Sequence, residues 1–277
     1  MLRTYRLHQP PATSHQPPAT SHSHQPPARY NSLMPTDDQF RALEKKVEEL
    51  TAQVGKLQDT QAVRDLQFKY GYYLDKCLYD EVVDLFTDDC EVHFIGGIFR
   101  GKASARRLYC GRFRTNFTGG HNGPVQGYLL DHMMLQDIID ISPDGKTAYA
   151  RLRVFMQAGR HHEYTDDTHP LRQWWEGSLY ENVYAKESGV WKLKVLNYRP
   201  VWHADFDKGW AFTKPHYVPY YTDTYPGNPT GPDELEKPTP PLWPETDTFP
   251  FHYPHPVTGK DVKLSPPPNI TQKVGAQ

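Results

Sequence analysis

The sequence has few cysteines and no long apolar run. Its three cysteines, Cys77, Cys90 and Cys110, include no closely spaced pair, which argues against a disulfide framework or a zinc site. A reducing compartment such as the cytoplasm is therefore the simplest location to expect. No run of about 18 consecutive apolar residues occurs, so the sequence predicts no segment that crosses a membrane.

The chain also lacks a concentration of charge. Its formal net charge is −2, and lysine and arginine are spread along the 277 residues. Proteins that bind nucleic acid or an acidic membrane surface usually present a basic cluster, so neither partner is expected. The sequence also lacks the glycine-rich loop that binds phosphates and the Gly-x-Ser-x-Gly motif of serine hydrolases, which argues against both classes of enzyme.

Proline is abundant, with 26 residues, and it gathers at the two ends of the chain. Residues 1–33 repeat the unit HQPPATS and contain too little apolar surface to fold, which predicts a disordered low-complexity tail. An extension upstream of a start at Met34 stays open as well. Residues 205–277 combine many prolines with many aromatic residues. This composition predicts an extended arm that packs on a folded surface, of its own chain or of a neighbour.

Residues 34–60 contain an apolar heptad pattern. The apolar side chains alternate in spacing between three and four residues, and they are Phe40, Leu43, Val47, Leu50, Val54 and Leu57. About three heptads of this kind are typical of a coiled-coil seam. Two interpretations stay open: a helix that packs on its own domain, and a short coiled coil between subunits. Gly55 weakens a free-standing helix and so favours the first.

The rest of the sequence, residues 61–203, predicts helices first and strands afterwards. Helices are expected at 61–75, 79–87 and 101–113, and strands at 90–97, 128–141, 147–158, 177–186 and 190–203. The sequence Ser-Pro-Asp-Gly at 142–145 predicts a tight turn between two of the strands. This order is typical of an α+β fold in which helices pack on one face of a curved antiparallel sheet.

Residues 70–94, YGYYLDKCLYDEVVDLFTDDCEVHF, resemble the opening of SnoaL-like proteins of the NTF2-like superfamily. The pair Asp131-His132 and the segments 144–148 and 189–193 are similar to later parts of the same family. The resemblance places the domain at about 61–204 and implies a cone-shaped α+β barrel. Because this superfamily includes dehydratases, isomerases, cyclases and non-catalytic proteins, the resemblance alone does not decide the activity.

The closest resemblance among the enzymes is to the scytalone-dehydratase-like and bile-acid-dehydratase-like members, which use a His–Asp pair and a tyrosine and no cofactor or metal. It implies that His132, Asp75 and Tyr70 are catalytic. Imidazole suits proton transfer near neutral pH, a carboxylate can orient it, and a phenol can stabilise an oxyanion. Structural alternatives stay open: a core histidine, a carboxylate at a helix end and a core aromatic. The acidic residue of the second long strand is not evident, because the inner face there carries Ala148, Ala150, Leu152, Val154 and Met156.

Four further residues are candidates for substrate binding: Tyr73, Asn182, Arg199 and His203. A buried amide at Asn182 needs partners that a substrate could supply, and Arg199 could pair with an anionic or phenolic oxygen. The alternative for Arg199 is a salt bridge at the surface or to the arm. The segment 161–169 contains His161, His162, Glu163 and His169, but the spacing fits no standard site, so no metal is predicted.

Two functional hypotheses follow. The first is a cofactor-independent lyase, a dehydratase or a formaldehyde-eliminating enzyme, that acts on a small aromatic or phenolic substrate. A looser resemblance to superfamily members that act on lignin-derived diarylpropanes favours it, and an isomerase or cyclase would use the same residues. The second is a non-catalytic ligand-binding protein or oligomer subunit, similar to a dioxygenase small subunit. Both predict a homodimer or homotrimer, with Arg151, Arg153 and Phe155 on the open face of the sheet.

Overall fold

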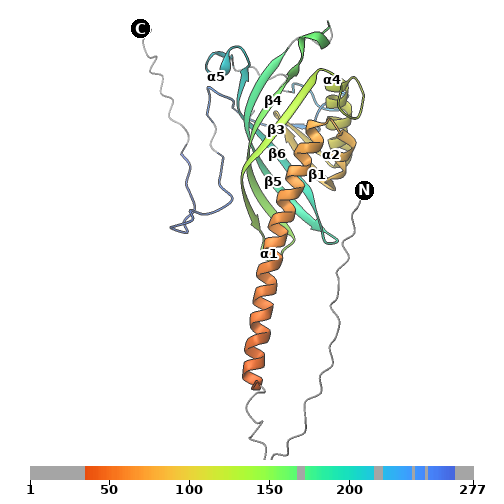
Figure 1. Ribbon diagram of the computed structural model, residues 1–277. Coiled ribbons are helices and arrows are strands. Elements are labelled where there is room, and N and C mark those ends of the chain that lie inside the picture. Colours follow the sequence, from red (N-terminus) through yellow and green to blue (C-terminus); the bar gives the residue numbers. More distant parts are fainter. Residues whose placement is uncertain (1–34, 167–171, 215–220, 239–240, 247–248, 266–277) are drawn as a thin grey trace, which may run out of the picture. The chain divides into compact units, whose positions relative to one another are not determined.

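The computed structural model describes residues 35–166, 172–214, 221–238, 241–246 and 249–265 (Figure 1). The chain divides into two units, Met1–Glu49 and Leu50–Gln277. The predicted disordered tail, 1–33, lies outside the described residues, and so does His169 of the loop considered for metal binding. None of the helices in the described ranges combines the length and the apolar character that crossing a membrane requires.

Helix α1, Asp37–Asp75, is one continuous helix, so the predicted division at residue 60 is wrong. The residues around the expected break, 58–62, read Gln-Asp-Thr-Gln-Ala and contain no proline or glycine that would end a helix. The helix begins with a capping box. Thr36 Oγ1 accepts a hydrogen bond from the main-chain N–H of Gln39 at 3.3 Å, and Gln39 Oε1 accepts one from that of Thr36 at 2.8 Å.

The second unit contains a seven-stranded sheet in the order β3-β4-β5-β6-β1-β2-β7. Its strands are β1 Phe86–Phe94, β2 Gly97–Arg100, β3 Tyr128–Ile141, β4 Thr147–Arg160, β5 Gln173–Glu187, β6 Val190–Asp205 and β7 Glu234–Leu235. All neighbours are antiparallel except β1 and β6. Figure 1 shows α2 and α4 on one side of the curved sheet and residues 249–265, in dark blue, on the other. The predicted α+β class, with helices on one face of a curved sheet, is confirmed.

The second unit also contains several short helices. They are α2 Tyr79–Asp84, α3 Lys102–Arg106, the π-helix η1 Arg107–Phe113, α4 Arg114–Thr118, the 3-10 helix η2 His162–Tyr164 and α5 Gly209–Phe212. The helix predicted at 101–113 is thus α3 followed by a turn of wider pitch. The predicted strand at 177–186 begins four residues earlier, at Gln173, and therefore includes Glu176.

A buried stripe on the second half of α1 packs on the sheet. Val63, Gln67, Tyr70 and Leu74 are buried at spacings of four, three and four residues, as expected for one face of a helix. On β4, the alternate residues that the sequence assigned to the inner face are all buried, and they are Ala148, Ala150, Leu152, Val154 and Met156. Because these side chains are small or aliphatic, they leave room above them for the larger side chains of α1 and η1.

A polar network inside this core joins α1 to β5 and β6. Asn182 Nδ2 donates to Gln67 Oε1 at 3.0 Å, and the Tyr184 hydroxyl donates to the same oxygen at 2.8 Å. Asn182 Oδ1 accepts the main-chain N–H of Asn197 at 3.0 Å. All three side chains are buried. The amide of Asn182 therefore has protein partners on both its oxygen and its nitrogen.

The far face of the sheet is contacted by the chain's own C-terminal residues. Arg151 donates to the carbonyl oxygen of Pro250 at 2.7 Å and lies over the Phe251 ring at 4.5 Å. His252 Nε2 lies 3.2 Å from a carboxylate oxygen of Asp140. Of the other two residues expected on this face, Arg153 donates to Gln136, and Phe155 packs against Trp175 and Trp202. Part of the face considered for a subunit contact is thus covered by the chain itself.

We predict that Asn182→Ala lowers the free energy of unfolding by about 1–3 kcal/mol, because it leaves the main-chain N–H of Asn197 without its acceptor and removes one of the two donors to Gln67 Oε1. Chemical denaturation monitored by circular dichroism measures this change. Tyr184→Phe, which removes one hydroxyl and keeps the Asn182–Gln67 bond, serves as the milder matched variant. Equal stability of Asn182→Ala and the unchanged protein would contradict the structural role assigned to the network.

Candidate active site

A cavity of about 320 Å³ lies between the helices and the concave side of the sheet. About half of its lining residues are aromatic, and these are Tyr70, Tyr79, Phe94, Tyr109, Phe113, Phe117, Tyr128, Trp174, Tyr180 and Tyr198. Cavities of about 150 Å³ with apolar walls accept a benzene molecule. The space inside this domain is therefore large enough for a small aromatic compound.

His132 lines this cavity, and Asp75, which is not among the lining residues, is hydrogen-bonded to it. Asp75 is the last residue of α1, and His132 is the fifth residue of β3. Asp75 Oδ1 lies 2.7 Å from His132 Nδ1 and accepts the main-chain N–H of His132 at 2.9 Å. Their side chains are only 10% and 8% exposed. The carboxylate assigns the ring proton to Nδ1, and Nε2 is then the nitrogen that can accept a proton.

Tyr70 lines the same cavity from α1. Its hydroxyl lies 2.9 Å from the hydroxyl of Tyr109 on η1, and its ring packs edge-on against Tyr180. Burial, together with the neighbouring Tyr109, holds the pKa of Tyr70 well above its usual range. Burial likewise raises the pKa of Tyr109 well above that range. Both side chains therefore stay neutral phenols, which can donate a hydrogen bond inside the cavity.

A row of four residues crosses the sheet at the level of His132. His132 on β3 pairs with Met156 on β4, Met156 with Glu176 on β5, and Glu176 with His203 on β6. All four line the cavity. Since neighbouring strands lie about 4.8 Å apart, the backbones at His132 and Glu176 are about 10 Å apart. The cavity is therefore flanked by ionisable groups from two non-adjacent strands.

Glu176 is buried and held by donors. Its Oε1 accepts the indole N–H of Trp174 at 2.8 Å, and its Oε2 accepts the hydroxyl of Tyr198. Ser178 Oγ donates to the same Tyr198 hydroxyl at 3.1 Å. The nearby carboxylate and, above all, burial raise the pKa of Tyr198 well above its usual range. Tyr198 is thus a neutral donor between Glu176 and the cavity.

Sequence reasoning missed Glu176 because the strand was expected to begin at residue 177. Tyr180, Asn182 and Tyr184 were recognised as one face of that strand, and the same alternation continued backwards passes through Ser178 and Glu176. The resemblance directed attention to the preceding strand for an acidic residue. That strand is apolar on its inner face, and the buried carboxylate lies one strand further along.

The other predicted binding residues lie in different places. His203 lines the cavity, whereas Tyr73, Asn182 and Arg199 are not among the described residues that do so. Tyr73 packs against the core from α1, and Asn182 belongs to the network with Gln67. Arg199 Nη1 lies 2.5 Å from a carboxylate oxygen of Glu236 in the C-terminal segment. Arg199 therefore forms the salt bridge to the arm that the sequence offered as the alternative to substrate binding.

Two arginines line the cavity that the sequence did not single out. Arg112 on η1 lies over the ring of Tyr221 at 4.8 Å, and Arg172 lies over the ring of Trp174 at 4.6 Å. Within the described ranges neither guanidinium is ion-paired with a carboxylate. Positive charge is therefore available at the cavity wall, although no sequence pattern identifies it.

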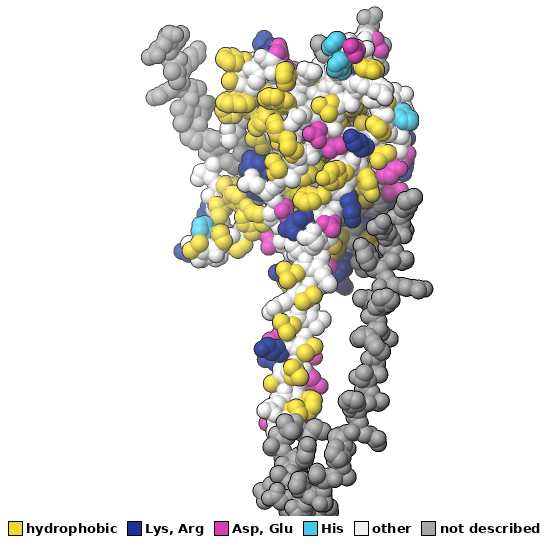
Figure 2. All heavy atoms as spheres, viewed as in Figure 1, with side chains coloured by type: hydrophobic (Ala, Val, Ile, Leu, Met, Phe, Trp, Pro, Cys, Tyr) yellow, Lys and Arg dark blue, Asp and Glu magenta, His cyan; other side chains and the backbone are white. Residues whose placement is uncertain are grey.

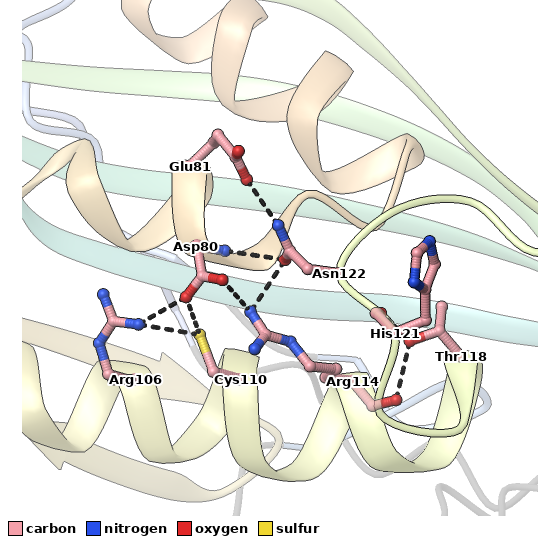
Figure 3. Close-up of polar contacts among 8 residues, drawn as sticks. All are labelled: Asp80, Glu81, Arg106, Cys110, Arg114, Thr118, His121 and Asn122. Carbon is pink, nitrogen blue, oxygen red and sulfur yellow. Dashed lines mark hydrogen bonds and ion pairs between the residues drawn. The ribbon is translucent and has the colours of Figure 1, made fainter.

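A polar cluster beside the cavity fixes the helices that form its wall (Figure 3). Asp80 on α2 pairs with Arg106 at 2.6 Å and with Arg114 at 2.6 Å, and Asn122 accepts from Arg114. Although partial burial opposes it, hydrogen bonding to the two arginines lowers the pKa of Asp80. Burial raises the pKa of the Cys110 thiol in the same cluster to about 11, so it stays protonated and is a poor nucleophile. No group of three or more potential metal ligands occurs among the described residues.

We predict that His132 carries its ring proton on Nδ1 and that Asp75→Asn abolishes this preference, because an amide can also donate to the ring. Nitrogen NMR of histidine-labelled protein reports the tautomer, and the missing signal in His132→Gln assigns it. His121, which does not bond to Asp75, is an internal control. A dominant Nε2–H tautomer in the unchanged protein would contradict this geometry.

Several solved structures are distantly similar to this chain. No curated protein matches the sequence. A crystal structure provisionally named a scytalone dehydratase, from Novosphingobium aromaticivorans, is 20% identical and covers 56% of this chain and 91% of its own, with a TM-score of 0.45. The hexachlorocyclohexane dehydrochlorinase LinA-type3 from Novosphingobium barchaimii is 17% identical and covers 60% and 99%, with a TM-score of 0.45. Likenesses this distant carry no argument about reaction or substrate.

The family comparison is more direct. A model of the SnoaL-like domain matches residues 55–197, which is more than half of the chain and includes α1 from Gly55 onward, the strands of the sheet up to Asn197, and the residues Tyr70, Asp75, His132 and Glu176. The resemblance inferred from residues 70–94 is thereby confirmed. The chain belongs to the SnoaL-like domain family.

Proposed function

We propose that this protein is a cofactor-independent lyase that acts on a small aromatic or phenolic substrate by acid–base catalysis. The observation that carries the proposal is that His132, which lines an aromatic cavity, is hydrogen-bonded to Asp75. Such a pair provides a positioned base whose side chain is only 8% exposed. Positioned acid–base groups typically accelerate proton transfer by about 10²–10⁴-fold.

In the proposed mechanism, His132 Nε2 removes a proton from the substrate and Asp75 stabilises the imidazolium that forms. In a dehydration, the proton comes from carbon, the adjacent C–O bond breaks, and a C=C bond forms. In a loss of formaldehyde, the proton comes from a hydroxyl, the neighbouring C–C bond breaks, and its electrons stay on the remaining fragment. Tyr70, as a neutral phenol, donates a hydrogen bond to the oxygen on which charge develops.

Glu176 and Tyr198 would supply the second proton of the reaction, which is the one that the leaving group or the remaining fragment takes up. The leaving oxygen, or the carbon that retains the electrons, needs a proton at a position separate from the one where His132 acts. Glu176, once protonated from solvent, can pass its proton to the Tyr198 hydroxyl, to which it is hydrogen-bonded, as that hydroxyl donates its own proton to the substrate. His132 releases the proton that it removed to solvent, so the protons balance over one turnover. Two groups on non-adjacent strands allow proton removal and proton return without rotation of the substrate.

The cavity lining supports the substrate class. Aromatic walls favour a substrate with one or more rings through edge-to-face and stacked contacts. Arg112 and Arg172 add positive charge that favours a phenolate or carboxylate group on that substrate. An isomerase would use the same base to move a proton between two carbons, so the identity of the product decides between these reactions.

We predict that His132→Ala lowers kcat/KM by at least about 10²-fold while the fold is retained, because the substrate loses its base. The enzyme is screened against hydroxylated diaryl and phenolic compounds, with water loss followed by mass spectrometry and formaldehyde by a colorimetric assay. His121→Ala, a histidine outside the cavity, is the matched control. Co-crystals of His132→Ala with the same compounds then show the bound orientation.

If no compound is turned over and no ligand enters the cavity, the non-catalytic alternative replaces the lyase.

We predict that Glu176→Gln lowers kcat by about 10–100-fold and changes KM less, because the amide keeps the shape of the side chain and cannot accept the second proton. Steady-state kinetics on the substrate found in the screen separate the two constants. Glu187→Gln, an exposed glutamate at the end of the same strand, is the control. An unchanged kcat would remove Glu176 from the mechanism and leave the His132–Asp75 pair as the only proton-transfer group.

A further inference from the structure

The heptad pattern of α1 has no part in the cavity and needs its own explanation. We propose that residues 40–57 of α1 form a parallel two-stranded coiled coil with the same segment of a second copy of this chain. The six apolar residues of the pattern are called the seam: Phe40, Leu43, Val47, Leu50, Val54 and Leu57. Within an unbroken helix their spacing puts them on one stripe.

The seam is open to solvent in the single chain. Its six side chains are between 50% and 70% exposed. Figure 2 shows hydrophobic side chains, in yellow, recurring along the segment of α1 that carries them. Six large apolar side chains on one stripe are far more than the scattered exposed residues of an ordinary surface. A partner that buries this stripe would remove the apolar surface from water.

The seam does not continue the stripe that packs on the sheet. Successive residues of a helix are rotated by about 100°, and summing this rotation places the seam and the buried stripe of Val63, Gln67, Tyr70 and Leu74 about 160° apart. The two stripes therefore lie on nearly opposite sides of one helix. The interpretation in which the seam packs on its own domain as part of the same face is not compatible with this rotation.

The residue types in the seam favour a second copy in a parallel arrangement. Counting Phe40 as position a, the following a positions are Val47 and Val54, and the d positions are all leucine. A β-branched residue at a with leucine at d favours a parallel pair of helices. The pattern ends where Gln61 and Arg64 take the next a and d positions, so the expected pairing extends from Phe40 to Leu57.

The flanking residues permit this pairing. In a parallel coiled coil, each g residue lies beside the e residue of the next heptad of the partner. The resulting pairs are Gln39 with Glu44, Lys46 with Thr51, and Gln53 with Gln58. None of them brings like charges together. The seam is thus self-complementary, which is the requirement for a contact around a two-fold axis.

The test compares the unchanged full-length chain with Leu50→Asp by sedimentation velocity over a range of concentrations. Leu50 lies at the centre of the seam, and a carboxylate there should raise the dimer dissociation constant by at least about 30-fold, as expected for the loss of a central interface residue. Ala52→Asp places the same charge on the same helix outside the seam and should leave the association unchanged. Circular dichroism confirms that each variant is folded.

A cysteine at Leu43 tests the parallel orientation. In a parallel pair the two copies of residue 43 face each other, so Leu43→Cys should form a disulfide-linked dimer on mild oxidation, whereas Ala52→Cys and the unchanged chain should not. The native cysteines Cys77 and Cys90 are buried, and Cys110 is partly exposed, so the unchanged chain also controls for cross-links through Cys110. A monomeric unchanged chain, association that Leu50→Asp does not weaken, or a Leu43→Cys chain that does not cross-link would each overturn the proposal. All of these measurements are independent of catalysis.

Discussion

The bond between Asp75 and His132 is the constraint on which the cavity depends. A carboxylate at the last residue of a helix lies next to the negative end of the helix dipole, which disfavours it. Asp75 is accommodated there because one of its oxygens accepts two N–H groups of His132, one from the ring and one from the main chain. The same two bonds tie the end of α1 to the first long strand of the sheet. A single side chain therefore positions a cavity wall and defines which ring nitrogen is basic.

The rest of the site follows from the geometry of the sheet and from burial. In-register residues of neighbouring strands point to the same face, so His132, Glu176 and His203 reach one cavity from three strands without any proximity in sequence. Burial keeps the tyrosines around them protonated, which makes each hydroxyl a donor rather than an anion. A buried carboxylate at Glu176 is compatible with these surroundings because Trp174 and Tyr198 donate to it.

The sequence predicts the architecture well and the site only in part. Alternating apolar residues and turn signals locate the long strands within a few residues, and the stretch 70–94 identifies the family. The meeting of Asp75 with His132 is expected from the resemblance alone, since 57 residues separate them and no local pattern links them. Asn182 and Glu176 show where prediction of the site from the sequence fails. Both are polar residues on the inner face of β5, and only the packing of α1 and η1 decides that one joins a core network while the other lines the cavity.

Helix α1 shows how a change in pattern can be misinterpreted. The apolar residues keep a heptad spacing up to Leu57 and resume at Val63 in a different phase, which suggested that one helix ended and another began. The backbone continues, because nothing in residues 58–62 disfavours a helix. A shift in phase along an unbroken helix means that the helix changes the face it buries, and hence its partner. The second phase is buried against the sheet of the same chain. The apolar residues of the first phase therefore need a different surface to pack on. The same heptad segment of a second copy of the chain is the surface that fits them best.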